Sequence, residues 1–366
     1  MSEKKFYFSS PSSENKLILG ELNKSIGDIF DSKVLILGEA VEKFEKNFSA
    51  YIGHDFCVGV NSGTDALIIS MKALGIGLGD EVITTNMSAL ATLASIIAVG
   101  ATPVIVDVDN DMLANLESIK KNISKKTKAV IYVHLYGDAS NAINIKKLCD
   151  DYKIDLIEDC AQSAGSKCGE FQAGALGKIS AFSFYPTKNL ASIGDGGAIL
   201  TSDKFLHKRV KEIRQYGWDA SRKPQSLGIN SRLDEIQAKV LNIKLKHLDF
   251  MLHEREKISA IYIERLSDTF EVVTNKINIP YHLFVIKVKR RDEFIAKLKK
   301  KNIYLGIHYA ETFSNTSHYK QFCQINSNLC ISESLSKEIV TLPIYPGLNR
   351  DDQLYICDEL ISSKVS

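Results

Sequence analysis

Apolar residues recur along this chain with two different spacings, which predict two kinds of element. Repeats every three or four positions predict helices, and they occur in residues 41–51, 66–74 and 90–99. Short apolar runs rich in β-branched residues predict buried strands, and they occur in residues 56–60, 81–84, 103–108, 129–135 and 156–158. The two patterns alternate from about residue 40 to residue 205. Such alternation predicts an α/β domain, with helices layered on a parallel or mixed sheet.

The pattern changes after about residue 205. Helical spacing predicts helices at residues 206–216, 233–252, 291–300 and 351–362, and apolar runs predict strands at residues 281–289 and 339–346. This mixture indicates a smaller α+β domain. We therefore expect a large domain over residues 1–245 and a small domain over residues 246–366, joined by the helices near residues 235–265.

Composition and charge exclude several classes of protein. Of the 366 residues, 45 % are apolar and 25 % are charged, as in an ordinary globular protein. The 46 basic and 44 acidic residues leave a net charge of +2, which gives no electrostatic reason to expect nucleic acid. The seven cysteines are irregularly spaced and form no CxxC pair, so we expect reduced thiols, no disulfide framework and no metal site. No signal-like or membrane-spanning apolar run is present, and we expect a cytoplasmic protein without a membrane partner.

Lys188 is the first candidate for chemistry. It lies between the aromatic segment 181–185 and the glycine cluster 194–197, which is followed by another apolar run. A lysine between two strand-like segments is placed to point into a cleft, where desolvation lowers its pKa. The resulting neutral amine is the nucleophile that Schiff-base chemistry requires. A solvated surface charge is the alternative.

Two other segments offer partners for such an amine. Asp159 ends the strand-like run 154–159 and can pair with a protonated ring nitrogen of a cofactor, although it also fits a helix N-cap. Gly63 and Thr64 open a helix, whose free N–H groups bind anions, although the same residues fit an ordinary capped helix start. The three elements suit the three functional groups of pyridoxal phosphate (PLP). In their order along the chain, the helix start suits the phosphate, Asp159 suits the ring nitrogen and Lys188 suits the aldehyde.

Five segments together resemble one known family. They are residues 61–67, 158–163, 182–190, 194–198 and 230–238, and they are similar to the DegT/StrS family of PLP-dependent nucleotide-sugar aminotransferases. The resemblance extends from about residue 14 to the end of the chain. It implies fold type I, the aspartate-aminotransferase fold: a three-layer large domain with a mixed, mostly parallel sheet, and a smaller C-terminal α+β domain.

The resemblance assigns a role to each matching residue around the cofactor ring. Lys188 matches the lysine that forms the Schiff base with PLP and then acts as general base and acid. Asp159 matches the acid that contacts the ring nitrogen, and Gln162 matches a residue that hydrogen-bonds the ring hydroxyl. Many relatives have an aromatic residue that stacks on the ring where this chain has Ala89. Something else then covers the ring, or the ring is more open. Ser88 could contact the cofactor or cap a helix.

The resemblance also implies how the phosphate is bound. Gly63, Thr64 and Ser183 match phosphate-binding residues of the same subunit. Asn230 matches an asparagine that crosses to the phosphate of the partner subunit. The implied assembly is a homodimer with shared active sites.

The implied reaction moves an amino group from L-glutamate, through pyridoxamine phosphate, to a nucleotide-linked (dTDP) keto-6-deoxyhexose. The implied product is a bacterial amino sugar for a glycan such as the O-antigen of lipopolysaccharide. Asp195 in Gly-Asp-Gly-Gly favours amination at C3 over C4. Tyr185, His308 and Tyr309 match residues near the sugar, with a core histidine as the alternative for His308, and residues 310–318 depart from the family pattern.

Three alternatives differ in how they account for these residues. A cyclitol aminotransferase would share every cofactor residue. A sugar dehydratase of the same fold replaces the Schiff-base lysine with histidine, so Lys188 argues against it. A regulatory or binding protein would keep the fold without the chemistry, but the chain has no basic stripe and no appended helix-turn-helix segment.

Overall fold

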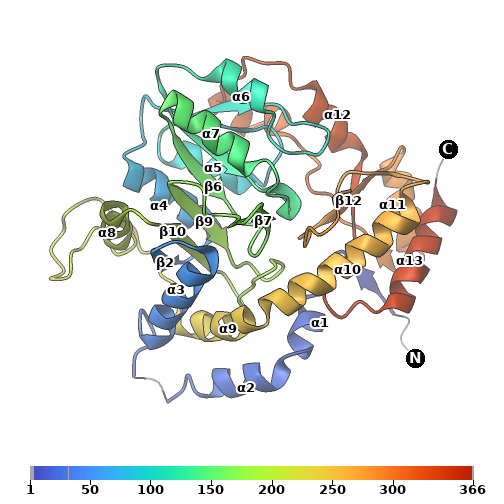
Figure 1. Cartoon of the computed structure of the whole chain (residues 1–366), viewed down its shortest axis with the longest axis horizontal. Coiled ribbons are helices and arrows are strands. Elements are labelled where there is room, and N and C mark those ends of the chain that lie inside the picture. The colour runs from blue at the N-terminus through green and yellow to red at the C-terminus, as the bar shows by residue number, and fades with distance from the viewer. Residues whose placement is uncertain (1–3, 32, 365–366) are drawn as a thin grey trace.

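A seven-stranded sheet lies at the centre of the computed structural model, which describes residues 4–31 and 33–364 (Figure 1). The strand order is β2-β10-β9-β6-β5-β3-β4. The strands are β2 (Phe56–Val60), β3 (Glu81–Thr85), β4 (Thr102–Val106), β5 (Thr127–Val133), β6 (Asp155–Asp159), β9 (Ile179–Ser183) and β10 (Gly197–Thr201). Only the pairs that involve β10 are antiparallel. The predicted mixed, mostly parallel sheet is therefore confirmed.

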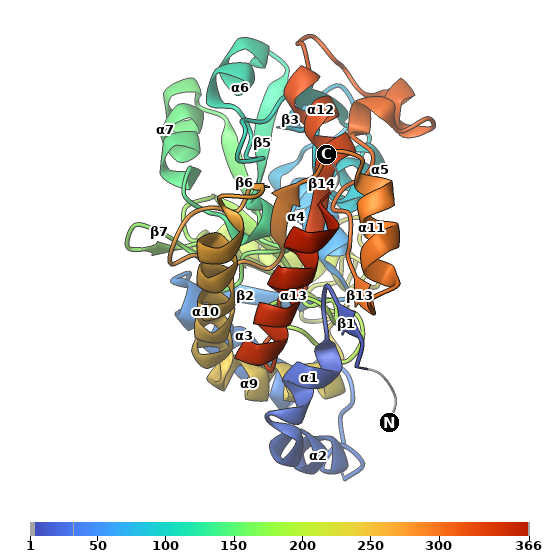
Figure 2. The same ribbon diagram turned by 90° about the vertical axis from the view of Figure 1, so that its right-hand side faces the viewer.

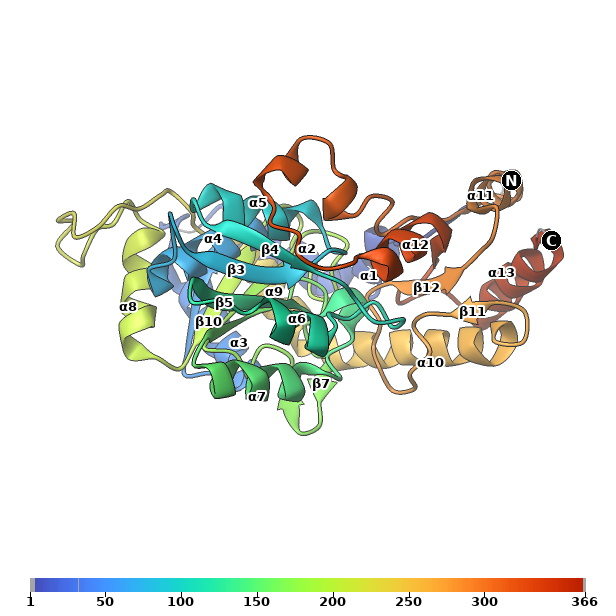
Figure 3. The ribbon, with the colours of Figure 1, turned by 90° about the horizontal axis from the view of Figure 1, so that it is seen from above.

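Helices cover both faces of this sheet, because alternate side chains of each strand point to opposite faces. Val82 and Ile131 pack in one apolar cluster, whereas Ile83 and Val130 pack in another. The helices on the first face are α4 (Gly63–Leu74), α5 (Leu90–Ala98) and α8 (Lys204–Ile213). Those on the second are α3 (Glu39–Ile52), α6 (Leu116–Asn122), α7 (Ala142–Tyr152) and α9 (Glu235–Lys246). Figure 3 shows α4 and α5 on one side of the strands and α6 and α7 on the other, which are the three predicted layers.

One predicted helix is two helices in the structure. The expectation of a single helix over residues 233–252 is wrong, because α9 ends at Lys246 and α10 (Leu248–Leu266) begins after a break at His247. The backbone of His247 is not helical (φ −101°, ψ 1°). A break of one residue leaves the apolar spacing almost unchanged, so the pattern did not reveal it. Beyond the break, α10 runs away from the large sheet (Figure 1).

A second, smaller sheet lies beside α10, with strand order β11-β12-β14. Its strands are β11 (Glu271–Val272), β12 (Phe284–Lys287) and β14 (Ile339–Leu342), and the helices around it include α11 (Arg291–Lys299), α12 (Cys330–Glu338) and α13 (Arg350–Ser363). Figure 2 shows α10, α11 and α13 around this sheet. The N-terminal strand β1 (Phe6–Tyr7) pairs with β13 (Ile303–Tyr304) at this end of the molecule. Where a domain boundary runs stays a prediction.

The N-terminal helices α1 (Pro11–Lys16) and α2 (Leu19–Gly27) were not predicted. A buried ion pair holds α1 in place, since Arg255 of α10 lies 2.6 Å from Glu14. Arg255 also donates to the carbonyl oxygen of Ile344, 3.0 Å away. All seven cysteines are free thiols, and five of them are buried. Within residues 4–31 and 33–364, no helix has the length and apolarity needed to cross a bilayer.

Candidate active site

The loop that holds Lys188 joins two neighbouring antiparallel strands. Ser183 at the end of β9 pairs with Gly197 at the start of β10, so residues 184–196 form the connection. Phe184 and Leu190 anchor this loop in the apolar core, where both are fully buried. The backbone N–H of Lys188 donates to the carbonyl oxygen of Tyr185 at 2.9 Å. The lysine thus lies in a fixed turn between two strands, as the sequence predicted.

The amine of Lys188 is partly buried and lacks a protein partner. It forms no hydrogen bond or ion pair with any residue that the structure describes. Burial lowers the pKa of Lys188 from about 10.5 to about 8, and the nearby charge of Asp159 opposes this effect only in part. A solvated surface lysine would keep its ordinary pKa. The amine is therefore suited to act as a nucleophile and as a base near neutral pH.

Asp159 is the last residue of β6, at the carboxyl end of the strand. Its Oδ2 accepts a hydrogen bond from Thr92 Oγ1 at 2.9 Å, and its Oδ1 accepts one from the N–H of Ala161 at 3.2 Å. The segment after Asp159 is a turn and not a helix, so the N-cap alternative for Asp159 is wrong. Burial raises the pKa of this carboxyl group, while Thr92, Ala161 and Lys188 act in the opposite direction. A cationic partner would favour the ionised form further.

The start of α4 presents free amides beside β9. Ser62 caps the helix by accepting a hydrogen bond from the N–H of Asp65 at 3.1 Å. The N–H groups of Gly63 and Thr64 have no acceptor in the part of the chain that the structure describes. A Cβ atom at Gly63 would lie 2.7 Å from Cβ of Ser183, so only glycine allows this close approach. The capped helix start and the anion site are therefore compatible, with two amides and the Ser183 hydroxyl on one small surface.

Gln162 connects this region to a distant loop. Its Nε2 donates to the hydroxyl of Tyr309 at 3.0 Å, and its Oε1 accepts from the N–H of Tyr136 at 2.7 Å. The hydroxyl of Tyr136 in turn donates to the carbonyl oxygen of His308. The sequence suggested that Gln162 follows Asp159 by one helical step, but the structure places Gln162 in a turn. The structure thus brings Gln162, His308 and Tyr309 together.

Two histidines lie within the electrostatic field of Lys188. His308 is partly buried and its Nδ1 is 2.9 Å from Thr341 Oγ1; burial, and to a lesser extent Lys188, lower its pKa to about 4. Burial and the charges of Lys188, Arg255 and His308 lower the pKa of His282 well below its usual value. Both rings are therefore neutral near pH 7, and His308 is not a fully enclosed core residue.

Sequence reasoning missed three residues of this region: Thr92, Tyr136 and His282. Thr92 is one of two polar residues, with Ser95, in an otherwise apolar helix pattern, which was a usable signal. Tyr136 has an unusual positive φ of 60°, which is visible only in the structure. His282 precedes an apolar strand and has no local signature. All three contact or face the candidate residues through the tertiary fold.

Ser88 is buried, and its Oγ lies 2.9 Å from Thr92 Oγ1. Ala89 is the residue that precedes α5, and no side chain caps this helix. The capping alternative for Ser88 is therefore wrong, while direct contact with a cofactor stays a prediction. The side chain of Ala89 is too small to stack on a ring. The aromatic group tied to the Asp159–Gln162 segment is Tyr309 instead.

Asn230 is not brought into contact with the other candidates, and Tyr185 contacts Ser183 and Lys188 through its backbone. Both are exposed, and the side chain of Asn230 forms no hydrogen bond within the described parts of this chain. Its neighbour Ser231 donates to Asp65 Oδ2 at 2.7 Å, in the first turn of α4. Asn230 is therefore held at the exposed rim beside the helix start that offers the free amides.

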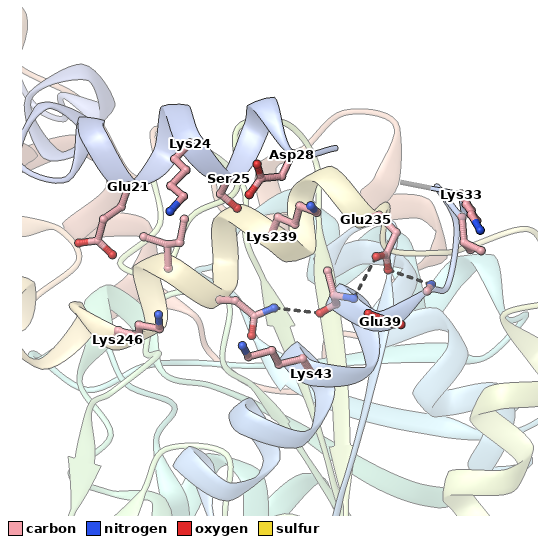
Figure 4. Close-up of a pocket in the computed structure, with 15 residues that line it drawn as sticks. Glu21, Lys24, Ser25, Asp28, Lys33, Glu39, Lys43, Glu235, Lys239 and Lys246 are labelled. Atoms are coloured by element: carbon pink, nitrogen blue, oxygen red, sulfur yellow. Dashed lines mark hydrogen bonds between the residues drawn. The ribbon is translucent and has the colours of Figure 1, made fainter. Parts of the chain in front are cut away.

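A large cavity of about 740 Å³ lies elsewhere, between α2, α9 and the start of α3. Figure 4 shows Lys24 of α2 and Asp28, directly after α2, facing Lys239 of α9 across it. Glu235 in its wall accepts hydrogen bonds from the backbone N–H groups of residues 38, 40 and 41. None of the candidate residues lines this cavity, and its alternating charges are those of a solvated surface groove.

The arrangement around Lys188 fits PLP by the chemistry of its groups. A nucleophilic amine without a partner suits an aldehyde, a buried carboxylate suits a ring N–H, and free helix amides with a hydroxyl suit a phosphate. Asp159 ends β6, the free amides begin α4, and Lys188 lies in the loop between β9 and β10. The three converge although they are far apart in the sequence.

Comparison with known proteins agrees with this fit. The model of the DegT/DnrJ/EryC1/StrS aminotransferase family matches residues 17–361. The chain is 39 % identical to dTDP-3-amino-3,6-dideoxy-alpha-D-galactopyranose transaminase of Aneurinibacillus thermoaerophilus, with 91 % of this chain and 92 % of the relative aligned. It is 36 % identical to dTDP-3-amino-3,4,6-trideoxy-alpha-D-glucose transaminase of Micromonospora megalomicea subsp. nigra, with 90 % and 91 % aligned.

The fold is also shared with solved structures. The crystal structure of S. venezuelae DesV in complex with a ketimine intermediate superimposes with a TM-score of 0.94 and 34 % identity, and covers 99 % of both chains. The prediction that the chain is an enzyme is confirmed, because the family model and these relatives are aminotransferases. The chain therefore belongs to the DegT/DnrJ/EryC1/StrS aminotransferase family and is a PLP-dependent transaminase.

Proposed function

We propose that this transaminase moves an amino group from L-glutamate to C3 of a dTDP-linked keto-6-deoxyhexose, for a bacterial amino sugar of a surface glycan. The observation that carries the chemistry is the unpartnered amine of Lys188, whose pKa is lowered to about 8 beside the buried Asp159. The sugar-nucleotide substrate is supported by the two dTDP-amino-sugar transaminases at 36 % and 39 % identity. No observation favours a cyclitol substrate.

The proposed cofactor residues divide the binding of PLP among themselves. The amides of Gly63 and Thr64 and the hydroxyl of Ser183 would hold the phosphate. Asp159 would hold the ring N–H, and Gln162 would reach the ring hydroxyl with the N–H of Nε2 that Tyr309 leaves free. When bound, PLP supplies an electron sink that stabilises negative charge on the carbon that loses its proton.

Lys188 would carry the proton in the reaction. Its amine takes the proton from Cα of the donor and delivers it to C4′ of the cofactor, and the second half-reaction repeats these transfers in reverse. Asp159 stabilises the positive ring nitrogen throughout. The anchored loop around Lys188 matters as much as its pKa, because one amine has to reach both carbon atoms.

The lowered pKa of Lys188 predicts how cofactor capture depends on pH. With a pKa of about 8, about one amine in ten is neutral at pH 7, against roughly one in three thousand for an ordinary lysine. We expect the rate of PLP capture by the stripped enzyme to rise up to about pH 8 and then level off. Stopped-flow absorbance would measure it. A rate that keeps rising tenfold per pH unit up to pH 10 would contradict the lowered pKa.

Three residues are proposed to face the sugar: Tyr185, His308 and Tyr309. The neutral imidazole of His308 and the hydroxyl of Tyr309 can exchange hydrogen bonds with sugar hydroxyl groups. Tyr185 exposes 52 % of its surface beside the Lys188 turn. A bound ligand would cover this exposed side chain. Asp195 and the names of the two relatives, both 3-amino-sugar transaminases, favour C3 over C4.

We also propose a homodimer in which Asn230 binds the phosphate of the partner's cofactor. The exposed, unpartnered side chain of Asn230 beside α4 supports this. Phe30 and Leu227 expose 86 % and 90 % of their surfaces, and the partner subunit would cover these apolar side chains.

Substrate and regiochemistry can be tested in one experiment. The enzyme is incubated with PLP, L-glutamate and either the dTDP-linked 3-keto or the dTDP-linked 4-keto-6-deoxyhexose, and NMR locates the new amine. We expect an amine at C3 and formation of 2-oxoglutarate. Amination of the 4-keto sugar alone would overturn the C3 preference. Transfer to neither sugar, by an enzyme that still consumes glutamate, would overturn the proposed substrate class.

A further inference from the structure

A short chain of hydroxyl groups leads to Asp159 from the start of α5. Oγ1 of Thr92 lies 2.9 Å from Asp159 Oδ2 and 2.9 Å from Oγ of Ser88. Thr92, Ser88 and Asp159 expose 1 %, 3 % and 4 % of their surfaces. Water can therefore not replace these hydrogen bonds easily, and the partners of Asp159 are set by the protein.

The chemistry of the three groups fixes the direction of the hydrogen bonds. An ionised carboxylate has no proton, so Thr92 is the donor to Asp159. A hydroxyl group has one proton, and Thr92 has thus used its own. The bond between the two hydroxyl groups then has Ser88 as donor and Thr92 as acceptor. A chain polarised in this way strengthens the bond that Asp159 receives.

The backbone adds to this effect. α5 begins at Leu90, so Thr92 lies in its first turn and Ser88 just before it. The N–H of Thr92 donates to the carbonyl oxygen of Ala89 at 3.1 Å, which fixes that turn. The first turn of a helix has partial positive charge, and the Thr92 hydroxyl in this turn donates to the carboxylate of Asp159.

These contacts oppose the cost of burying Asp159. Burial raises the pKa of Asp159, and the hydrogen bond from Thr92 is the largest contribution in the opposite direction, followed by the N–H of Ala161 and the charge of Lys188. His134 also favours the ionised form, and the charge of Asp159 in turn raises the pKa of Tyr309 and of Cys160. Without Thr92, a larger fraction of Asp159 would be protonated and unable to accept the ring proton.

We propose that Thr92, supported by Ser88, is a positioning residue that keeps Asp159 ionised and oriented toward the ring nitrogen of PLP. The inference rests on the proposed role of Asp159. It gives Ser88 a function without contact to the cofactor. It also assigns a role to a residue that sequence reasoning did not select.

The test compares PLP binding by variants of the holoenzyme that have been stripped and then titrated with PLP. Thr92→Val keeps the shape and removes the hydroxyl. We expect its Kd for PLP to rise about tenfold or more, because a hydrogen bond to a charged group is lost. We expect Ser88→Ala to weaken binding by about two- to fivefold, because it removes only the supporting bond. Thr92→Ser should restore most of the affinity.

A spectroscopic readout separates positioning from packing. A ring nitrogen that loses its proton also loses the positive charge that makes the lysine-bound cofactor acidic. The pH midpoint of its visible absorbance band should then shift upward in Thr92→Val, by about half a unit to one unit. The matched control is Thr84→Val, since Thr84 is also buried but donates to the carbonyl oxygen of Ile131 at 3.1 Å. This control should leave affinity and midpoint unchanged.

Two results would overturn the inference. One is wild-type affinity and midpoint in Thr92→Val. The other is a Thr92→Ser variant as weak as Thr92→Val, which would assign the effect to packing of the methyl group. If Thr92→Val does not fold, the other two variants still test the inference. Wild-type PLP affinity in Ser88→Ala together with lost PLP affinity in Thr92→Ser would contradict the proposed chain of hydroxyl groups. PLP binding needs neither sugar nor donor, so failure here is distinct from failure of the proposed substrate.

Discussion

Lys188→Ala is expected to abolish amine transfer, with a loss in kcat of at least about 10,000-fold. The variant loses both the nucleophile that attaches the cofactor and the base that moves the proton between two carbon atoms. Lys188→Arg should fail equally, because guanidinium keeps the charge but does not give up its proton near neutral pH. Half-reaction kinetics with L-glutamate and absorbance in the visible range would measure both variants.

The covalent role can be located directly. Borohydride reduction of the wild-type holoenzyme, followed by peptide mass analysis, should place the cofactor mass on the peptide that contains Lys188. Lys120→Ala is the matched control, because Lys120 is an exposed lysine on α6 without an ion pair among the described residues. It should retain full activity. A label on another lysine, or activity that survives in Lys188→Ala, would refute the role assigned to Lys188.

Asp159→Asn is expected to lower kcat/KM by about 100- to 1,000-fold, which is the usual cost of removing one preorganised charge from an active site. Asparagine keeps the size and can still accept from Thr92, but it cannot hold the proton of the ring nitrogen by its charge. PLP affinity should fall at the same time. Steady-state kinetics and cofactor titration would measure the two effects.

We expect Asp159→Asn to leave the stability of the folded chain unchanged or slightly higher, although it lowers activity. The pKa of Asp159 is raised in the folded chain, so the ionised carboxylate opposes folding of the stripped protein above the pKa of the unfolded state. Removing the charge should leave the melting temperature of the stripped enzyme equal or slightly higher. Asp155→Asn, at the other end of β6 and paired with Lys178 at 3.0 Å, should change neither activity nor PLP affinity. A melting temperature that falls sharply in Asp159→Asn would instead indicate a structural role.

The strand and helix pattern of the large sheet could be read from the sequence because each element carries its own periodic signal. Strands β2 and β3 and helix α11 lie within one residue of their predicted ends. The pattern failed where the signal was too small to detect. A bend of one residue at His247 separates α9 from α10, and strands of two residues such as β1 and β13 are too short to show alternation.

The candidate site was accessible to sequence reasoning only in part. Lys188, Asp159 and the start of α4 stand in local contexts that limit what they can do, namely a loop between strands, a strand end and a helix start. The partners of these residues lack such contexts. Thr92 reaches Asp159 across 67 positions of the chain, and Tyr309 reaches Gln162 across 147.

The sequence by itself therefore determined the α/β class, and it singled out Lys188 and the cofactor elements as candidates, since these depend on local spacing, on residue chemistry and on the resemblance of short motifs to one family. Only the tertiary structure decided which groups surround that amine and how they change its acidity. It aligned the carboxyl ends of β6 and β9 in one sheet, and it placed α5 and the loop of residues 308–309 against them. The reason is physical: hydrogen bonds and desolvation act between groups that are close in space, and strand order, which local periodicity does not encode, decides which groups those are.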